Sequence, residues 1–288
     1  MVELWAYIEE QVYGSLPKKL PKSMQKLVAD TAIGTALDLT YYLTKPYTNN
    51  KYYQEMKGIA DGSGADFKVL RRVHMIGELT KGHCSMFGAW GSATKNGETV
   101  QLRSLDWDFD GPYRKYPTVT VYHPSSKKDG NVWMNIGFAG WIGILSGVSE
   151  QQMAISEIGV SYPDSTFGKE SRIGNPFTFL LRDILQFDHS LNDTIARMKK
   201  TRRTCNLILG VGDGKAGYFR GFQYGHSVIN VVDDTKPLPV NDTWHPAIKD
   251  TVYWGMDWLC PSFTERLVLK MLHRHNCCRK TTDKSVQN

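Results

Sequence analysis

The spacing of apolar residues changes at about residue 83, and this change constrains the fold more than any other feature of the chain. Before that point, apolar residues recur at helical intervals. After it, most stretches show the pattern of β-strands, and two helical stretches at 175–187 and 190–200 separate the earlier strands from the later ones. Strands, then helices, then strands predict a layered α+β domain.

The boundaries of the expected elements follow from these patterns and from the prolines and glycines between them. Further helices are expected at residues 2–13, 23–43, 52–62, 66–79 and 261–275. Strands are expected at residues 84–93, 98–105, 117–123, 131–138, 151–160, 205–212, 216–222 and 227–233. The last residues, 273–288, are polar and largely aperiodic, which predicts a disordered tail.

The composition is that of a folded globular protein. Of the 288 residues, 41% are hydrophobic and 22% are charged, which supplies enough apolar side chain for a sizeable core. The net charge of +6 is a small excess spread along the chain, so we expect no nucleic-acid partner, while peripheral contact with an anionic membrane stays compatible with it. No stretch reaches the roughly 18 apolar residues of a membrane span.

The cysteines and histidines do not form a pattern typical of metal binding. The five cysteines are odd in number and contain no CxxC pair, which argues against a zinc knuckle and against a dense disulfide framework. The histidines show no HxxxH spacing. We therefore expect no metal and no cofactor.

Cys84 opens the first predicted strand, in the stretch ELTKGHCSMFGAW. The next strand is joined to it by TKNG, and Asn96-Gly97 is a strong signal for a tight hairpin. An antiparallel pair folded about that turn brings the end of the second strand, RSLDWD, back beside the start of the first. Arg103, Asp106 and Asp108 are therefore expected near Cys84.

The residues alone leave two interpretations of Cys84 open. An arginine beside a thiol lowers the pKa of the thiol and raises its thiolate fraction, which is typical of a reactive cysteine. In the other interpretation, Cys84 packs as a small hydrophobic side chain. Arg103 and Asp106 then form an ordinary surface ion pair.

A family resemblance favours the first interpretation. The stretch GHCSMFGAWGSA, followed by NGETVQLRSLDWD, resembles the nucleophile hairpin of acid ceramidase and N-acylethanolamine acid amidase, and in particular acid-ceramidase-like proteins of social amoebae and other protists. The glycine-rich stretch 137–156 is similar to a strand–turn–strand of the same group, and the likeness covers roughly residues 50 to 232. These proteins are N-terminal-nucleophile hydrolases, so the resemblance implies a four-layer αββα sandwich.

The resemblance also implies self-processing. The chain would cleave its own His83–Cys84 bond, and Cys84 would become an N-terminal nucleophile whose α-amine acts as general base. Residues 1–83 would then form a helical small subunit, and residues 84–272 the catalytic domain. This arrangement would explain why a cysteine stands at the start of a strand.

Roles for individual residues are carried over from the same resemblance. Arg103 matches the arginine that supports the thiolate and the substrate carbonyl, and Asp106 matches the aspartate that orients the α-amine. Trp107 follows it as in the family. Asn241, in PLPVNDTWHP, matches an asparagine of the oxyanion hole, where one donor is worth about 3 kcal/mol. From the residues alone, Asn241 is equally well a turn residue.

The chain departs from the family pattern in two places. The family has a second functional arginine shortly after that asparagine, whereas the next arginine here is Arg266, on a predicted helix. Family chains also continue into further strands, whereas this chain passes into a polar stretch. These departures favour a rival interpretation, a non-catalytic protein of the same fold with a binding or structural role.

The function that the resemblance implies is cleavage of lipid-like N-acyl amides of the ceramide or N-acylethanolamine type. The partners would be that substrate and the chain's own N-terminal segment. An acyltransferase of the same fold is the alternative among enzymes. Several tryptophans are candidates for lining an apolar acyl pocket: Trp90, Trp107, Trp133 and Trp141.

The resemblance further implies a lysosomal or secreted glycoprotein. The first residues lack the features of a signal peptide, so a cytoplasmic location is the alternative. Two N-x-T sequons occur, at Asn192 and Asn241. We expect the glycan at Asn192, on an exposed loop before a helix, because a glycan on Asn241 would exclude that residue from an active site.

Overall fold

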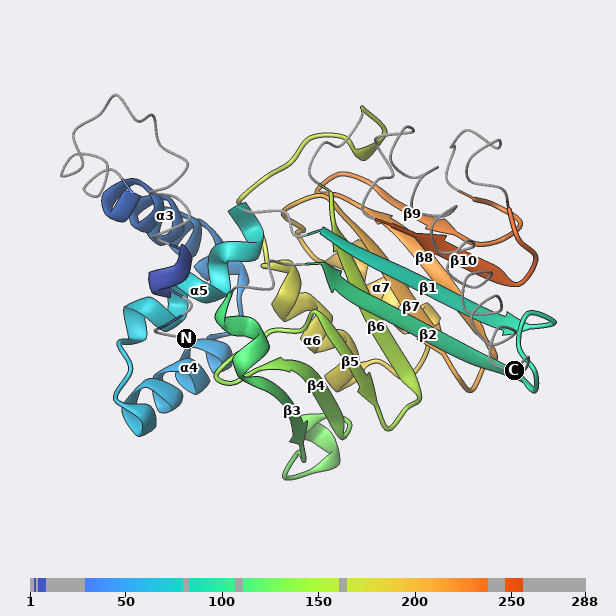
Figure 1. Ribbon diagram of the computed structural model, residues 1–288, viewed down its shortest axis with the longest axis horizontal. Helices are drawn as coiled ribbons and strands as arrows, with labels where there is room; N and C mark the ends of the chain where they lie inside the picture. Colours follow the sequence, from blue (N-terminus) through green and yellow to red (C-terminus); the bar gives the residue numbers. More distant parts are fainter. Residues whose placement is uncertain are drawn as a thin grey trace, which may run out of the picture.

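The computed structural model describes residue 3 and residues 5–8, 29–79, 83–106, 111–160, 165–237 and 247–255 (Figure 1). Two antiparallel sheets lie face to face, two helices cover the outer side of the larger sheet, and a group of helices stands at one end. The α+β class predicted from the sequence is confirmed. Over the described ranges, none of the helices has the length and apolarity to cross a membrane.

The helical group at the end of the molecule comes from the first part of the chain. Its main helices are α3 (Gly34–Thr44), α4 (Asn50–Ser63) and α5 (Phe67–Leu79). Residues Ala29–Ile33 form a π-helical turn before α3. The side chain of Asn49 caps α4 by accepting a hydrogen bond from the backbone N–H of Lys51 at 3.0 Å. Gly64 ends α4 with φ 71°, a conformation that glycine adopts without strain.

The smaller sheet has the order β10-β1-β2, and the larger has the order β3-β4-β5-β6-β7-β8-β9. The strands of the smaller sheet are β1 (His83–Gly91), β2 (Gly97–Asp106) and β10 (Thr251–Trp254). Those of the larger sheet are β3 (Pro117–Tyr122), β4 (Trp133–Phe138), β5 (Ser146–Ser149), β6 (Met153–Gly159), β7 (Leu207–Asp213), β8 (Tyr218–Tyr224) and β9 (Ile229–Val232). The helices behind the larger sheet are α6 (Phe177–Phe187) and α7 (Leu191–Lys200).

These elements confirm most of the predicted ones and correct a few. The sequence pattern did not predict β5 or β10, which have four residues each and no clear alternation in SGVS or TVYW. β1 ends at Gly91, whose φ of 49° starts the turn, two residues before the predicted end. The predicted helix 261–275 and the predicted tail lie outside the described residues.

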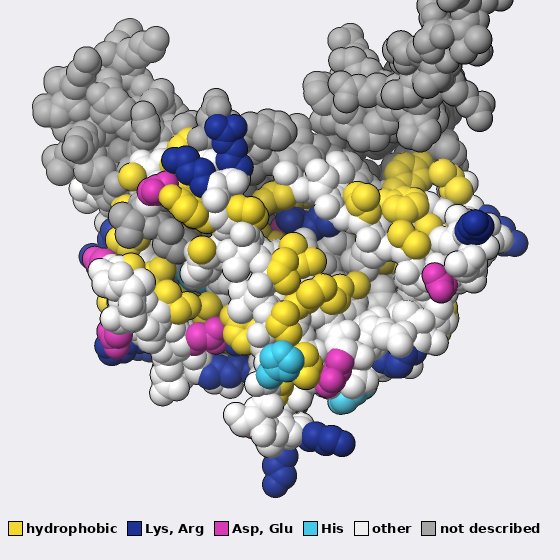
Figure 2. Space-filling model, turned by 60° about the horizontal axis from the view of Figure 1, so that its bottom comes forward, with side chains coloured by type: hydrophobic (Ala, Val, Ile, Leu, Met, Phe, Trp, Pro, Cys, Tyr) yellow, Lys and Arg dark blue, Asp and Glu magenta, His cyan; other side chains and the backbone are white. Residues whose placement is uncertain are grey.

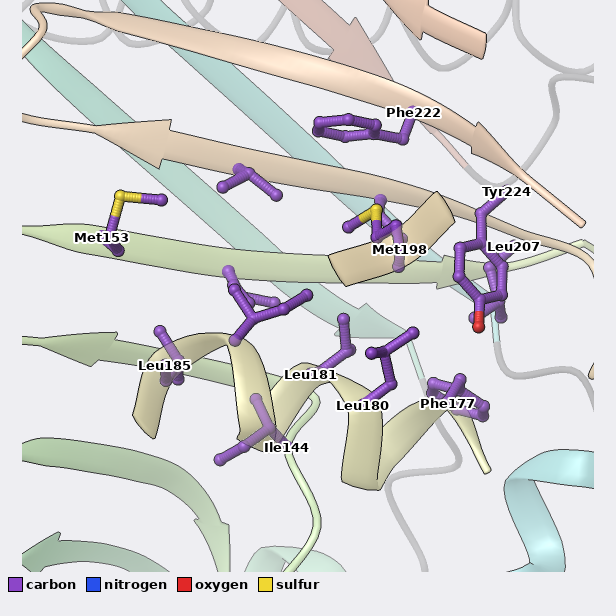
Figure 3. Close-up of a cluster of buried hydrophobic side chains, with 14 of the residues drawn as sticks. Ile144, Met153, Phe177, Leu180, Leu181, Leu185, Met198, Leu207, Phe222 and Tyr224 are labelled. Carbon is purple, nitrogen blue, oxygen red and sulfur yellow. The ribbon is translucent and has the colours of Figure 1, made fainter. Parts of the chain in front are cut away.

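The larger sheet and its two helices enclose one hydrophobic core, shown in Figure 3. Helix α6 contributes a row of leucines and phenylalanines that meets the outer face of β6, β7 and β8. The labelled side chains of this core are Ile144, Met153, Phe177, Leu180, Leu181, Leu185, Met198, Leu207, Phe222 and Tyr224. Full burial of one such side chain contributes roughly 1.5–3 kcal/mol, so this core fixes α6 firmly on the sheet.

A second core lies between the two sheets. Met86 and Trp254 from the smaller sheet pack against Ile208 and Phe219 from the larger one. Cys84 belongs to this core. No described helix lies on the other face of the smaller sheet, so the described residues form three layers: α6 and α7, the larger sheet, and the smaller sheet.

A third core joins the N-terminal helices to the rest of the molecule. Tyr52 of α4 stacks on Phe179 of α6, with ring centroids 4.7 Å apart. Trp141 and Ile142, which follow β4, are buried in the same cluster. The helical segment therefore has no separate core of its own in this region; it shares one with residues after Cys84.

The close approach of the two sheets predicts a steric effect at Gly88. A Cβ atom at Gly88 would lie 2.2 Å from Cγ of Phe219. We expect Gly88→Ala to lower the free energy of unfolding by about 1–3 kcal/mol, because the sheets must separate to admit the methyl group. Urea unfolding measures this change.

Gly58→Ala is the matched control. Gly58 lies in α4 with no atom within 4 Å of an added Cβ. The same substitution there should stabilise the protein by about 0.5–1 kcal/mol, since alanine favours helix over glycine. Equal effects at the two positions would contradict the tight contact between the sheets.

Candidate active site

Cys84 lies at the second position of β1 and faces the space between the sheets. Its direct neighbour across the hairpin is Leu105 of β2, and Arg103 pairs with Met86 two residues further along. Residues two apart on a strand share a face, so Cys84 and Arg103 point to the same side. The Cys84 side chain is fully buried.

The structure brings Arg103 to Cys84, as the hairpin signal predicted. The guanidinium Nη2 of Arg103 donates a hydrogen bond to Sγ of Cys84 at 3.1 Å. A cationic donor at this distance favours a thiolate over a thiol. The role of Arg103 in catalysis stays a prediction, whereas its position beside the sulfur is observed.

Glu157 is a member of this site that sequence reasoning missed. Its Oε1 accepts a hydrogen bond from Nη2 of Arg103 at 2.5 Å, and its backbone carbonyl accepts one from Nε at 2.8 Å. The two side chains are only 7% and 6% exposed, so they form a buried ion pair. The sequence did contain one indication of this role: Glu157 is the single charged residue in the largely apolar stretch MAISEIGV. A charge buried in such a strand needs a partner of opposite charge.

The pairing of β5 with β6 explains how Arg103 reaches Glu157. β5 is short, and its register with β6 runs only from Ser146 opposite Ser156 to Val148 opposite Ala154. Glu157 is the first residue of β6 beyond that pairing. Ser146 completes the contacts of the guanidinium, since its Oγ accepts a hydrogen bond from Nη1 of Arg103 at 3.3 Å.

The structure describes the other predicted site residues only in part. Asp106 is opposite His83 at the end of the hairpin, one residue from Cys84 along the ladder, but its side chain lies outside the described part. Trp107, Asn241 and Arg266 also lie outside the described residues. Within the described ranges, no group of three His, Cys, Asp or Glu side chains is arranged to hold a metal ion.

The geometry limits what the site can do. Arg103 is held at three nitrogens by Glu157, Ser146 and Cys84, so its orientation is fixed before any substrate arrives. It can stabilise charge on the sulfur, and a carbonyl oxygen placed beside the sulfur would meet the same cation. Such an arrangement suits nucleophilic attack by Cys84 on a carbonyl carbon.

Comparisons with known proteins agree with the resemblance of the Cys84 hairpin to amoebal proteins. No family model matches the chain. The chain is 41% identical over 243 residues to Protein dcd1A of Dictyostelium discoideum, which is 81% of this chain and 54% of that protein. The chain spans about half the length of the curated relatives it matches.

Two solved structures resemble this one in part. The N-acylethanolamine-hydrolyzing acid amidase ortholog of Caenorhabditis elegans has a TM-score of 0.43 and 15% identity, over 60% of this chain and 69% of that chain. The conjugated bile acid hydrolase of Clostridium perfringens has a TM-score of 0.36 and 16% identity, over 56% of this chain and 55% of that chain.

The buried ion pair predicts strong coupling between Arg103 and Glu157. We expect Glu157→Met alone to lower the free energy of unfolding by about 3–5 kcal/mol, because it leaves a buried guanidinium without its counter-charge. The double variant Arg103→Met with Glu157→Met should recover most of that loss. Urea unfolding of both single variants and the double variant measures the coupling. Additive losses would show that the two side chains do not depend on each other.

Proposed function

We propose that this chain is a self-processing cysteine amidohydrolase that cleaves the amide bond of lipid-like N-acyl amides, of the ceramide or N-acylethanolamine type. The observation that carries the proposal is the hydrogen bond from Arg103 to Cys84 at the start of β1. It supports a nucleophilic sulfur at the position where the motif places the cleavage. Under this proposal the fold is the four-layer sandwich of such hydrolases, of which the described residues supply three layers.

Self-cleavage before Cys84 would make the buried sulfur accessible to a substrate. The Cys84 side chain is fully buried, so its sulfur has no exposed surface at which an outside substrate could meet it. In the proposed reaction, Sγ of Cys84 adds to the carbonyl carbon of His83 and the C–N bond breaks. The thiol proton passes to the released α-amine. Water then hydrolyses the thioester, which regenerates the thiol and leaves a carboxylate on His83.

Turnover of an amide substrate repeats the same chemistry on an external carbonyl. The new α-amine of Cys84 accepts the thiol proton, since an α-amine titrates at about pH 7.7. Asp106 orients that amine and Arg103 supports the developing charge. Asn241 would donate to the oxyanion. The leaving amine takes the proton, and water releases the acyl group from Cys84.

An uncovered apolar surface beside the site supports a lipid-like substrate. The smaller sheet covers only part of the larger one, and no described strand or helix is laid over the inner face of β3, β4 and β5, although Arg103 reaches Ser146 at the start of β5. We call this surface the acyl floor; it consists of Val119, Val121, Met134, Ile136 and Val148. Figure 2, which brings the lower side of the molecule forward, shows hydrophobic side chains gathered across the middle of that view.

The acyl floor is continuous with the candidate site, because neighbouring strands place a floor residue beside a residue that contacts Arg103. Ile136 is opposite Ser146, whose hydroxyl contacts Arg103. Val119, Val121 and Ile136 are 59%, 50% and 46% exposed. A soluble protein gains by covering such a surface, and an acyl chain whose carbonyl reaches Cys84 would cover it.

The compartment is part of the same proposal. We propose a lysosomal or secreted protein that carries a glycan on Asn192. Asn192 is exposed, but it is the second residue of α7 rather than a loop residue ahead of the helix. Peptide mapping after endoglycosidase treatment tests this placement.

Substitution of Cys84 tests the processing step. We expect Cys84→Ala to give a folded chain that stays uncleaved at about its full 32.6 kDa, because the same sulfur performs cleavage and turnover. Denaturing gel electrophoresis measures the outcome, with Cys205→Ala as the control that keeps cleavage. Cleavage at the same bond in the Cys84→Ala chain would point to an outside protease.

A charge on the acyl floor tests the substrate class. We expect Val121→Lys to lower kcat/KM by about tenfold or more for a long-chain N-acyl amide, since the chain loses an apolar contact of roughly 1.5–3 kcal/mol. The value for a short-chain amide should change less than twofold. Val100→Lys is the matched control, because Val100 is 48% exposed on the opposite face of the smaller sheet. Equal losses for both chain lengths, or in both variants, would contradict an acyl site on this surface.

A further inference from the structure

His74 is a buried histidine on α5 that the site described above does not use. Its ring stacks on the ring of Trp141 at 4.7 Å with an interplanar angle of 7°, and Phe179 of α6 lies beyond at 6.3 Å. Only 1% of its surface is exposed. Both ring nitrogens have protein partners: Leu70 on α5 and Ile142 on the turn after β4.

These partners define the protonation state of the ring. Nδ1 lies 2.7 Å from the backbone carbonyl oxygen of Leu70, which can only accept, so Nδ1 carries a proton. Nε2 lies 3.0 Å from the backbone nitrogen of Ile142, which can only donate, so Nε2 must offer a lone pair. The ring is therefore neutral, and a second proton on Nε2 would face an N–H group.

Burial and the nearby cation Arg182 both disfavour a charged imidazole at His74. Burial is the largest influence; together with the positive charge of Arg182 on α6, and against the hydrogen bond that Nδ1 donates to the Leu70 carbonyl, it lowers the pKa of His74 to about 4. Arg182 is paired with Glu55 on α4, with Nη2 and Oε2 2.7 Å apart. One turn further along α5, Oε1 of Glu78 accepts from the backbone N–H of Phe177.

The turn that His74 holds leads directly to the candidate site. Residues 141–144 are fixed from several sides: Asn135 Nδ2 donates to the carbonyls of Trp141 and Gly143, and the Ile144 N–H donates to the carbonyl of Thr178. Two residues later, Ser146 begins β5 and contacts Arg103. α5, for its part, ends at Leu79, just before the predicted cleavage at His83–Cys84.

We propose that His74 is a positioning residue. Its neutral ring accepts the hydrogen bond from the Ile142 N–H, which we call the clasp, and so holds α5 to the turn at residues 141–146 and keeps Ser146 against Arg103. Protonation of Nε2 breaks this hydrogen bond. The link from Ser146 to chemistry at Cys84 rests on the proposed function, whereas the clasp itself does not. It joins the predicted small subunit to the catalytic domain across the cleavage point. Acid would therefore loosen the two segments from each other.

The pH dependence has a definite sign. The pKa of His74 is lower in the folded chain than the ordinary value of about 6.5. The neutral clasp therefore contributes fully above about pH 6.5, and its contribution is lost as the pH falls toward about 4. Within that window, one group of this kind raises the unfolding equilibrium constant by at most about tenfold per pH unit.

Two substitutions at His74 distinguish the loss of the hydrogen-bond acceptor at Nε2 from the gain of a positive charge on the ring. His74→Gln keeps an acceptor for the Ile142 N–H but does not titrate, and His74→Phe keeps the stacking but has no acceptor. Urea unfolding between pH 7.5 and 4 is measured on full chains that also carry Cys84→Ala, so that cleavage does not interfere. We expect the His74 chain to lose stability more steeply than His74→Gln below pH 6.5. His74→Phe should be less stable than His74→Gln at pH 7.5.

Equal pH slopes in the His74 and His74→Gln chains would overturn the proposal, as would equal stability of the Gln and Phe variants at pH 7.5. If neither variant folds, nitrogen chemical shifts of histidine-labelled protein decide. They should show a neutral ring protonated at Nδ1 at pH 6, and a charged ring at that pH would overturn the clasp.

Self-cleavage is the second measurement, made at pH 7.5 in chains that keep Cys84. We expect His74→Gln to cleave like the unmodified chain and His74→Phe to cleave at least severalfold more slowly. If the unmodified chain does not cleave at all, the proposed function fails while the unfolding data still test the clasp. Cleavage at the same rate in all three chains would overturn the link from His74 to Ser146.

Discussion

The buried guanidinium of Arg103 is the interaction on which the rest of the candidate site depends. It reaches from the smaller sheet to Glu157 on the larger one and touches Sγ of Cys84 on the way. A charge that is 7% exposed is tolerated only with a counter-charge and with its N–H groups satisfied. Arg103 therefore adds a buried ion pair to the apolar core between the sheets and sets the charge beside the sulfur.

Among the described residues the two sheets differ in width, with three strands in the smaller and seven in the larger. Three strands are enough to place Cys84 and Arg103 over β6, β7 and β8. Of the four remaining strands of the larger sheet, β3, β4 and β5 have no described strand or helix laid over their inner face, although Arg103 contacts Ser146 at the start of β5. Within the described part of the chain, a narrow sheet over a wide one leaves Cys84 buried and an apolar surface beside it.

The N-terminal helices belong to this arrangement rather than to a separate domain. They share a core with α6 and with the turn after β4, and the ion pair of Glu55 with Arg182 crosses the same boundary. A chain cut before Cys84 would keep these contacts, because none of them passes through residues 81–83. Cleavage would then free the amine of Cys84 without separating the segments.

Sequence reasoning reached the local part of this picture and missed the distant part. Asn96-Gly97 indicates a hairpin, and any hairpin there brings the end of β2 back towards Cys84; in the structure residues 92–96 form the loop, and Arg103 lies opposite Met86. Glu157 lies 54 residues from Arg103 on another sheet, and the pairing of two sheets is not encoded in any short pattern. The sequence did not predict β5 for a related reason: its residues SGVS form a strand because they pair with β4 and β6 on either side.

Peptide mapping by mass spectrometry, after incubation with a long-chain N-acylethanolamine, tests the central claim most directly. We expect a peptide that begins at Cys84 with a free α-amine and, after acid quenching, carries the added mass of the acyl group as a thioester on that residue. A peptide that runs unbroken from Gly82 through Ser85, with no acyl group on Cys84, would contradict it.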